Sequence, residues 1–309
     1  MAGAGKSLEA EGCGRVPLRV PVRAAERAYA REGELAADPP HEHTRPPVRA
    51  LLLAGRRGPT DAVAAAAGVS HRPLVPVAGV AMLVRVLRTL EATAGVGPIA
   101  ISIDAPQLLE RLPEVAEALG TGRVSAAASL DSPSASVGAA VAALAPGERL
   151  LVTTADHPLL TPPVVGGFLR EALARDADLV VGVVAATTVR AAHPGAVRTF
   201  VPLRGEAYSG ANLFLARAPG ARRVCEFWRE AERFRKRPWR LVRTFGLPTL
   251  ALFLLRRLDL AAALARASDV IGARVEAVVL ADAEAAIDVD RPADLALATR
   301  LLEARERRG

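Results

Sequence analysis

From Val48 onward, short apolar runs alternate with segments of helical character. Continuous apolar runs predict buried strands at 48–54, 98–103, 149–154 and 178–185. Amphipathic spacing predicts helices at 79–93, 106–119, 135–144, 161–175 and 291–307. This alternation indicates an α/β fold: a Rossmann-like, three-layer α/β/α arrangement around a mostly parallel sheet.

Two segments depart from the alternation. Residues 198–215 predict strands or a hairpin that turns near Gly205. Residues 219–268 predict consecutive helices, interrupted at Arg237-Pro238 and Leu247-Pro248, and we interpret them as a helical insertion or lid. The nucleotide-binding domain would then comprise a first part at 48–218 and a closing part, with the last strands and the C-terminal helix, at 269–309.

Residues 1–47 lack this periodicity. They contain runs of charge and the proline pairs Pro39-Pro40 and Pro46-Pro47. Such a composition buries too little apolar surface to fold alone. We therefore predict a disordered N-terminal arm.

Composition and charge narrow the function classes. The chain has 309 residues, 51% of them hydrophobic and 4% aromatic, so the core must consist of Ala, Val and Leu. The net charge of +7 indicates an anionic partner such as a nucleotide or a membrane surface, or it reflects an arginine-rich coding composition. Basic residues do not accompany a recognised reader motif, so we expect no nucleic-acid partner. No apolar run reaches the ~18 residues of a spanning helix, and no signal peptide is evident, so we expect a cytoplasmic protein.

Candidate chemistry begins where the first predicted strand ends. The apolar run from Val48 to Leu53 stops at Ala54-Gly55-Arg56-Arg57-Gly58. Loops at the carboxyl ends of strands bind ligands in open α/β sheets. Exposed backbone N–H groups and guanidinium charge suit a polyphosphate there. Arg72, a short loop further on, could fold back onto the same phosphates; the alternative is an ordinary surface arginine.

Two aspartates are candidate metal ligands. A buried strand brings Asp156 to its carboxyl end, where Pro158 ends the strand. Mg²⁺ usually binds one or two carboxylates together with phosphate oxygens and water. The alternative is that Asp156 caps the helix beginning near Thr161. Strand alternation puts Asp288 and Asp290 on one face, and Asp290 could be a helix cap, a second metal ligand or both.

Together these segments resemble the molybdenum-cofactor guanylyltransferase-like (MobA-like) nucleotidyltransferases, which have a GT-A-type fold. The similarity covers about 48–217 and resumes at about 272–300. It is carried by five elements in order: Leu52-Leu53-Ala54-Gly55 for the L-x-A-G loop, His71 to Gly79 for K-x-L-x-x-x-x-G, Asp156-His157-Pro158 for D-x-P, Ser209-Gly210-Ala211-Asn212 for S-G-x-N, and Asp288 to Leu295 for D-x-D-x-P-x-D-L.

The resemblance implies a role for each matching residue. Nucleotide-binding residues would be Leu53, Ala54, Gly55, Arg56 and Gly58, with Ser134 and Ser136 at the base, where an ordinary helix cap is the alternative. Catalytic residues would be Arg72, Asp156 and Asp290, the two aspartates holding Mg²⁺. Acceptor-binding residues would be Gly210 and Asn212.

The implied activity is Mg²⁺-dependent transfer of a nucleoside monophosphate from an NTP to a phosphorylated small-molecule acceptor, with release of pyrophosphate. Two departures from the family pattern stand out. The segment Arg56 to Asp61 replaces the G-x-G-T-R-M loop, and Arg72 replaces a lysine, which keeps the charge but not the compact ammonium geometry. Alternatives are a GT-A-type glycosyltransferase that uses a nucleotide-sugar, or a non-catalytic nucleotide-binding protein.

The predicted insertion has chemistry of its own. Basic residues cluster with Phe227, Trp228, Phe234 and Trp239, and 245–255 is strongly apolar. Such a segment could make peripheral contact with the inner face of an anionic membrane. It could also cover an anionic acceptor, or simply have one solvated face and one packing face.

Overall fold

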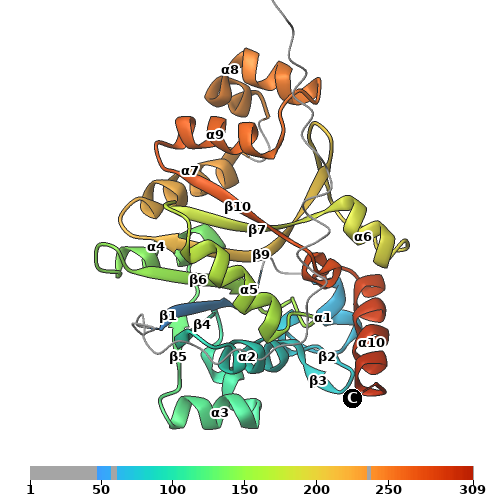
Figure 1. Ribbon diagram of the computed structural model, residues 1–309. Helices are drawn as coiled ribbons and strands as arrows, with labels where there is room; N and C mark the ends of the chain where they lie inside the picture. The colour runs from blue at the N-terminus through green and yellow to red at the C-terminus, as the bar shows by residue number, and fades with distance from the viewer. Residues whose placement is uncertain (1–46, 57–60, 235–237, 309) are drawn as a thin grey trace, which may run out of the picture. The chain divides into compact units, whose positions relative to one another are not determined.

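The computed structural model describes residues 47–56, 61–234 and 238–308 (Figure 1). Residues 1–46 lie outside this range, and with them almost all of the predicted N-terminal arm. The side chains of residues 233–244 are likewise outside the description.

One mixed sheet organises the described chain, and it confirms the predicted α/β class. Its order is β10-β7-β9-β6-β1-β4-β5, and β8 pairs with β9 alone. β9 is antiparallel to β6 and β7, whereas the other neighbours along this order are parallel. The strands are β1 (Val48–Leu53), β4 (Val96–Ile103), β5 (Val124–Ala128), β6 (Arg149–Thr154), β7 (Leu179–Ala185), β8 (Val201–Pro202), β9 (Ala207–Arg217) and β10 (Val275–Leu280).

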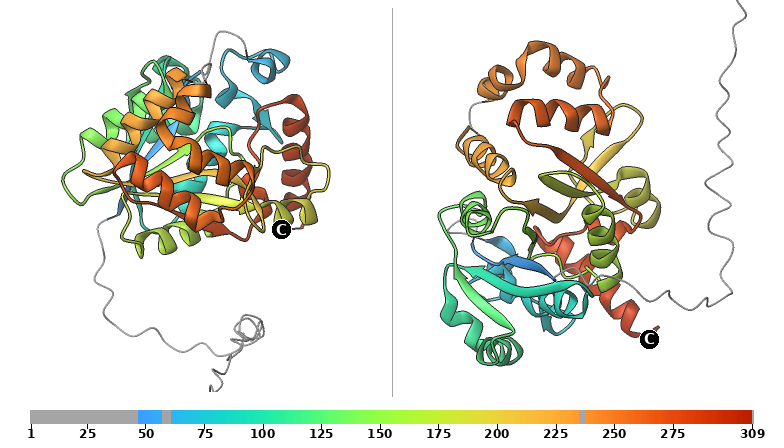
Figure 2. Two further views of the ribbon diagram at one scale, coloured as in Figure 1. Left: turned by 90° about the horizontal axis from the view of Figure 1, so that it is seen from above. Right: turned by 60° about the vertical axis from the view of Figure 1, so that its left-hand side comes forward.

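Helices cover both faces of this sheet (Figure 2). The helices are α1 (Ala62–Ala66), α2 (Met82–Ala92), α3 (Pro113–Gly120), α4 (Pro133–Ala142), α5 (Pro162–Leu173), α6 (Ala186–Ala192), α7 (Ala221–Phe234), α8 (Pro238–Leu254), α9 (Leu260–Ile271) and α10 (Pro292–Glu306). Short 3₁₀ helices are η2 (Arg72–Leu74), η3 (Pro106–Arg111) and η4 (Ala283–Ala286).

The central strand β1 is covered on both sides from Ala50 onward, which explains its apolar run from Ala50 to Leu53, whereas Arg49 near its start is exposed. Ala50 and Leu52 pack into the core with α2, α3 and α5. Leu51 faces the other way and packs with α4 and α7. A third apolar cluster joins α1 and α10, and it includes Ile287 and Val289 from the segment that precedes α10. That cluster holds residues 287–291, which we call the closing segment, beside the sheet.

The predicted elements are largely confirmed, with local corrections. The helix expected at 79–93 begins only at Met82, because β2 (Pro76–Val77) and β3 (Val80–Ala81) form a hairpin that turns at Gly79, φ 76°. The helix expected at 106–119 is divided into η3 and α3, since Pro113 starts a new helix. α1, β5 and α6 were not predicted. A closing strand is present as β10, but the strand alternation expected at Asp288 and Asp290 is wrong, because residues 287–291 form no strand between η4 and α10.

The segment at 219–268 contains α7, α8 and α9, as expected. α7 packs against α4, and α9 packs against β10. α8 is broken at Gly246, φ 75° and ψ 154°, two residues before Pro248. No helix in the described part of the chain is both long and apolar enough to span a bilayer.

Candidate active site

Backbone hydrogen bonds bring three distant segments together at the carboxyl ends of β1 and β6. The N–H of Ala155 donates to the carbonyl of Leu53 at 2.9 Å. The N–H of Val289 donates to the carbonyl of Asp156, also at 2.9 Å. The end of β6 therefore lies between the end of β1 and the closing segment, as the predicted site requires.

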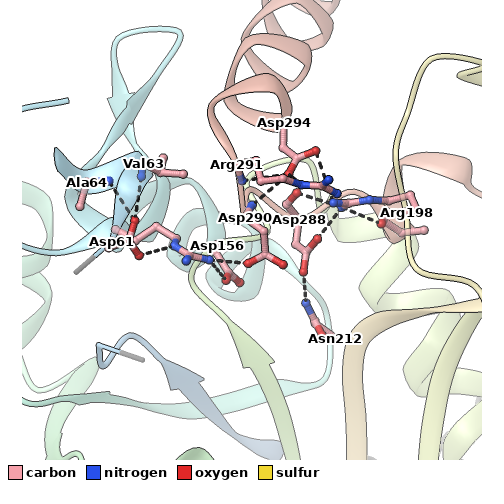
Figure 3. A network of polar contacts seen from close by, with 12 residues as sticks. Asp61, Val63, Ala64, Asp156, Arg198, Asn212, Asp288, Asp290, Arg291 and Asp294 are labelled. Atoms are coloured by element: carbon pink, nitrogen blue, oxygen red, sulfur yellow. Dashed lines mark hydrogen bonds and ion pairs between the residues drawn. The ribbon is translucent and has the colours of Figure 1, made fainter. Parts of the chain in front are cut away.

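Three carboxylates meet at this point (Figure 3). Asp156, Asp288 and Asp290 each offer an oxygen atom, and these atoms lie within 4.8 Å of one another. Asp156 is buried, whereas 41% of the Asp290 side chain is exposed. Hard oxygen donors of this kind suit Mg²⁺. Asp288 joins the group although the sequence pointed to Asp290 as the ligand on that face.

Arg72 connects the two predicted metal ligands. Its Nη1 atom lies 3.3 Å from Asp156 Oδ2 and also donates to Asp290. Burial opposes the charge of Arg72, but hydrogen bonding to Asp61 and the negative charges of Asp156 and Asp61 outweigh it and raise its pKa. The guanidinium is thus a fixed positive charge within the carboxylate group.

Asp61 holds Arg72 in place, a role that was not predicted. Asp61 Oδ2 accepts a 2.7 Å hydrogen bond from Arg72 Nε. Its Oδ1 atom accepts from the N–H groups of Val63 and Ala64, each at 3.0 Å, and so caps α1. Burial would raise the pKa of Asp61, but these bonds and the charge of Arg72 keep it below its ordinary value. An aspartate before an alanine-rich helical run is a cap signal, but the sequence does not show that Arg72 is its second partner.

Asp288 is held from two sides. Arg198 donates to its carboxylate and, at 2.9 Å, to its backbone carbonyl. Asn212 donates from Nδ2 to Asp288 Oδ2 at 3.2 Å. Burial would raise the pKa of Asp288, but His157, Arg198 and the bond from Asn212 keep it low. Asn212, predicted on the acceptor side, therefore reaches the carboxylate group, and Arg198 is a site residue that the sequence did not indicate.

His157 packs beside the carboxylates. It is fully buried, and burial lowers its pKa despite the neighbouring aspartates, so the imidazole is neutral near pH 7. Neither ring nitrogen has a hydrogen-bond partner among the described residues. A neutral, enclosed ring is suited to packing against Asp156 rather than to proton transfer.

The loop after β1 approaches the end of β5 closely. A Cβ atom on Gly55 would lie 2.5 Å from Ser129 Oγ, so a larger residue does not fit without movement. Asp104 accepts from the Arg56 N–H at 3.1 Å and from Arg56 Nε at 3.3 Å. The same carboxylate contacts His71 Nε2 at 3.2 Å. The Arg56 side chain is thus engaged by Asp104, while Gly58 lies outside the described residues.

The predicted base-contacting serines are buried near the start of α4. Ser132 caps this helix through the N–H of Ala135, so neither Ser134 nor Ser136 is the cap. Ser134 Oγ donates to Glu232 of α7 at 2.5 Å, and Ser136 Oγ accepts from the Leu130 N–H at 2.9 Å. A role at the base stays a prediction for both. Gly210 is exposed on β9.

The helix-cap alternatives for Asp156 and Asp290 are wrong. α5 begins after Thr161, not after Asp156. At α10, Arg291 occupies the cap position, and Asp294 accepts the N–H groups of Asp290 and Arg291 at 3.3 and 2.9 Å. Asp294 therefore serves the helix, which leaves the Asp290 carboxylate directed at the cluster.

Residues 50–274 match the family of the MobA-like NTP transferase domain, which is more than half of the chain. The chain belongs to this family. Members are nucleotidyltransferases, and this chain is therefore an enzyme of that class rather than a glycosyltransferase. No curated protein sequence matches the chain.

Solved structures agree with the family. A hypothetical transferase from Thermus thermophilus is 31% identical, with a TM-score of 0.66, and the match covers 81% of this chain and 99% of that one. CMP:2-keto-3-deoxy-manno-octonic acid synthetase complexed with CTP is 14% identical, with a TM-score of 0.50 over 84% and 99% of the two chains. A 4-diphosphocytidyl-2C-methyl-D-erythritol synthase from Anaerococcus prevotii DSM 20548 is 12% identical, with a TM-score of 0.50 over 83% and 96%. The last two show the shared fold.

Proposed function

We propose that this enzyme transfers a nucleoside monophosphate from an NTP to the phosphate of a small-molecule acceptor and releases pyrophosphate. One observation carries the proposal: Arg72, Asp156 and Asp290 converge beside the loop after β1, at the carboxyl edge of the sheet. An enzyme that cleaves a triphosphate needs cationic side chains and metal-binding carboxylates side by side, because both neutralise the charge of the phosphates.

The donor set suits a magnesium ion. Asp156 and Asp290, the ligands that the family resemblance implies, would hold it, and Asp288 offers an oxygen within 4.8 Å of theirs. Asp288 also fixes the geometry of the segment before α10, since Arg198 binds its carboxylate and the carbonyls of Ala286 and Asp288. When bound, the ion would neutralise phosphate charge and polarise the α-phosphate.

The reaction needs little acid–base help from the protein. An oxygen of the acceptor phosphate, already ionised near pH 7, attacks the α-phosphorus of the NTP. The bond between the α-phosphorus and the α–β bridging oxygen breaks, and pyrophosphate leaves with that oxygen. Catalysis is then positioning together with charge stabilisation. This suits a site whose buried histidine, His157, is held neutral and enclosed.

Arg72 would stabilise the charge that develops on the departing pyrophosphate. It is held by Asp61 through Nε, while Nη1 is directed at Asp156 and Asp290. The planar guanidinium of Arg72 keeps its orientation because its Nε atom is bonded to Asp61. Asn212, which extends from β9 to the Asp288 carboxylate, would face the acceptor, with Gly210 leaving room beside it.

The proposal is tested by incubating the protein with each NTP, Mg²⁺ and a panel of sugar and alcohol phosphates. We expect pyrophosphate, not a free nucleoside diphosphate, as the second product, and none after chelation by EDTA. Asp156→Ala should lower the rate by about 10²-fold or more. Asp176→Ala, at an exposed carboxylate joined to Arg217 and Arg274, is the matched control. Wild-type rates in Asp156→Ala would refute the assignment.

A further inference from the structure

The second half of α8 presents an apolar, exposed face. After the break at Gly246, the exposed fractions of Leu247, Leu254 and Leu255 are 72, 68 and 66%, the largest of any large apolar residues in the described part of the chain. Ala251 is exposed as well. Leu255 continues the helical spacing, since its N–H donates to the Ala251 carbonyl at 2.9 Å. Positions i, i+4, i+7 and i+8 lie on one side of a helix. We call these four residues the leucine face.

α8 is held by packing on both sides of the break at Gly246. Before the break, Phe245 meets Phe227 of α7 edge to face, with 5.9 Å between the ring centroids. Leu250 and Phe253 are partly buried, and α8 packs against both α7 and α9. The helix is therefore anchored by its less exposed residues, and the leucine face remains exposed to solvent.

The sequence that flanks this face is rich in basic residues. Residues 233–258 contain eight basic and no acidic side chains, whereas the whole chain has a net charge of +7. The remaining residues thus carry one more acidic than basic side chain. Arg256 and Arg257, both exposed, directly follow the leucine face. Coding composition would spread arginine along the chain, so this local excess indicates a surface that meets negative charge.

We propose that the leucine face of α8 docks on an anionic phospholipid bilayer. Apolar side chains on one side of a helix, with cations at its end, match a helix that lies within the interface and does not span it. This agrees with the finding that no helix in the described ranges could span a membrane. A second copy is a poorer occupant, because a symmetric interface would bring two strongly basic segments together.

The proposal is independent of the nucleotidyl transfer and has its own test. Purified full-length protein is sedimented with vesicles of phosphatidylcholine alone or of phosphatidylcholine mixed with phosphatidylglycerol. We expect binding to the anionic vesicles, weakened by salt. The triple variant Leu247→Ser, Leu254→Ser, Leu255→Ser should lower the binding constant by about tenfold or more. Arg256→Gln should lower it by about fivefold, as should Arg257→Gln.

The controls separate docking from misfolding. Val201→Ser with Val279→Ser removes two exposed apolar side chains from strands, outside α8, and should bind as wild type does. Circular dichroism melts should show that the leucine variant stays folded. Equal binding of wild type and leucine variant, or no preference for anionic vesicles, would overturn the proposal. So would a concentration-dependent dimer of the wild type, without lipid, that the leucine variant does not form.

Discussion

The Nε atom of Arg72 donates a 2.7 Å hydrogen bond to Asp61 Oδ2, and the same aspartate caps α1 with its other oxygen. The predicted phosphate-binding cation is therefore anchored to the helix that follows the loop after β1. Asp61 ends the segment 56–61, which departs from the family pattern, so this segment contributes a residue to the site. The Asp61 carboxylate couples the start of α1 to the orientation of the Arg72 guanidinium.

Asp61→Asn should separate the two roles of this carboxylate. Asparagine caps helices about as well as aspartate, so the melting temperature should change little. The charge that anchors Arg72 is lost, and we expect kcat for pyrophosphate release to fall about tenfold. Asp61→Ala should lose the cap as well, which costs about 1 kcal/mol of unfolding free energy. Unchanged kcat in the asparagine variant would mean that Arg72 needs no anchor.

Arg72→Lys should retain activity that Arg72→Gln does not. Lysine keeps the positive charge near Asp156 and Asp290, but its single ammonium cannot also bond Asp61 through a separate Nε atom. We expect about a tenfold loss for lysine and at least a hundredfold loss for glutamine in kcat/KM for the NTP. Equal losses in the two variants would show that fork geometry, and not charge, is what the site uses.

Gly55→Ala should weaken nucleotide binding. The new Cβ atom would lie 2.5 Å from Ser129 Oγ and 3.2 Å from Ser129 Cβ, so the loop must shift. We expect KM for the NTP to rise severalfold, which steady-state kinetics would measure. The double variant Gly55→Ala, Ser129→Gly removes the clashing side chain and should recover most of the loss, because the two residues are in contact. A double variant no better than the single one would place the defect elsewhere.

Asp104→Asn should change the pH dependence of stability in acid. Burial would raise the pKa of Asp104, but hydrogen bonds, among them those from Arg56 and His71, lower it in the folded state. A lowered folded pKa stabilises the fold above the unfolded pKa of about 4, and this contribution is lost as the pH falls through the folded value. The wild type should thus be more stable than the variant at pH 7, by less than about 1 kcal/mol because the site is part-exposed.

Urea unfolding at a series of pH values checks this. The difference between wild type and Asp104→Asn should shrink steadily below about pH 4 and vanish once the native carboxyl is protonated. A difference that stays constant across this range would show that charge on Asp104 does not contribute.

Much of the sheet could be predicted from the sequence. β1, β6 and β7 are apolar runs that only an interior strand can accommodate, and their lengths and order indicate parallel pairing. β5 was not predicted because it is an edge strand, with a partner on one side only. Val-Ser-Ala-Ala-Ala in β5 is half exposed and carries neither a continuous apolar run nor a β-branched series.

The sequence by itself determined that Asp156 ends an interior strand and that Asp290 precedes a helix, because apolar run length and proline position are local signals. Only the tertiary structure decided that Asp61, Arg198 and Asp288 complete the site. Arg72 lies 11 residues from Asp61 along the chain, and Asp288 lies 90 residues from Arg198. Contacts of that kind depend on how packed segments meet in space, and the spacing of residues along a chain does not encode them one by one.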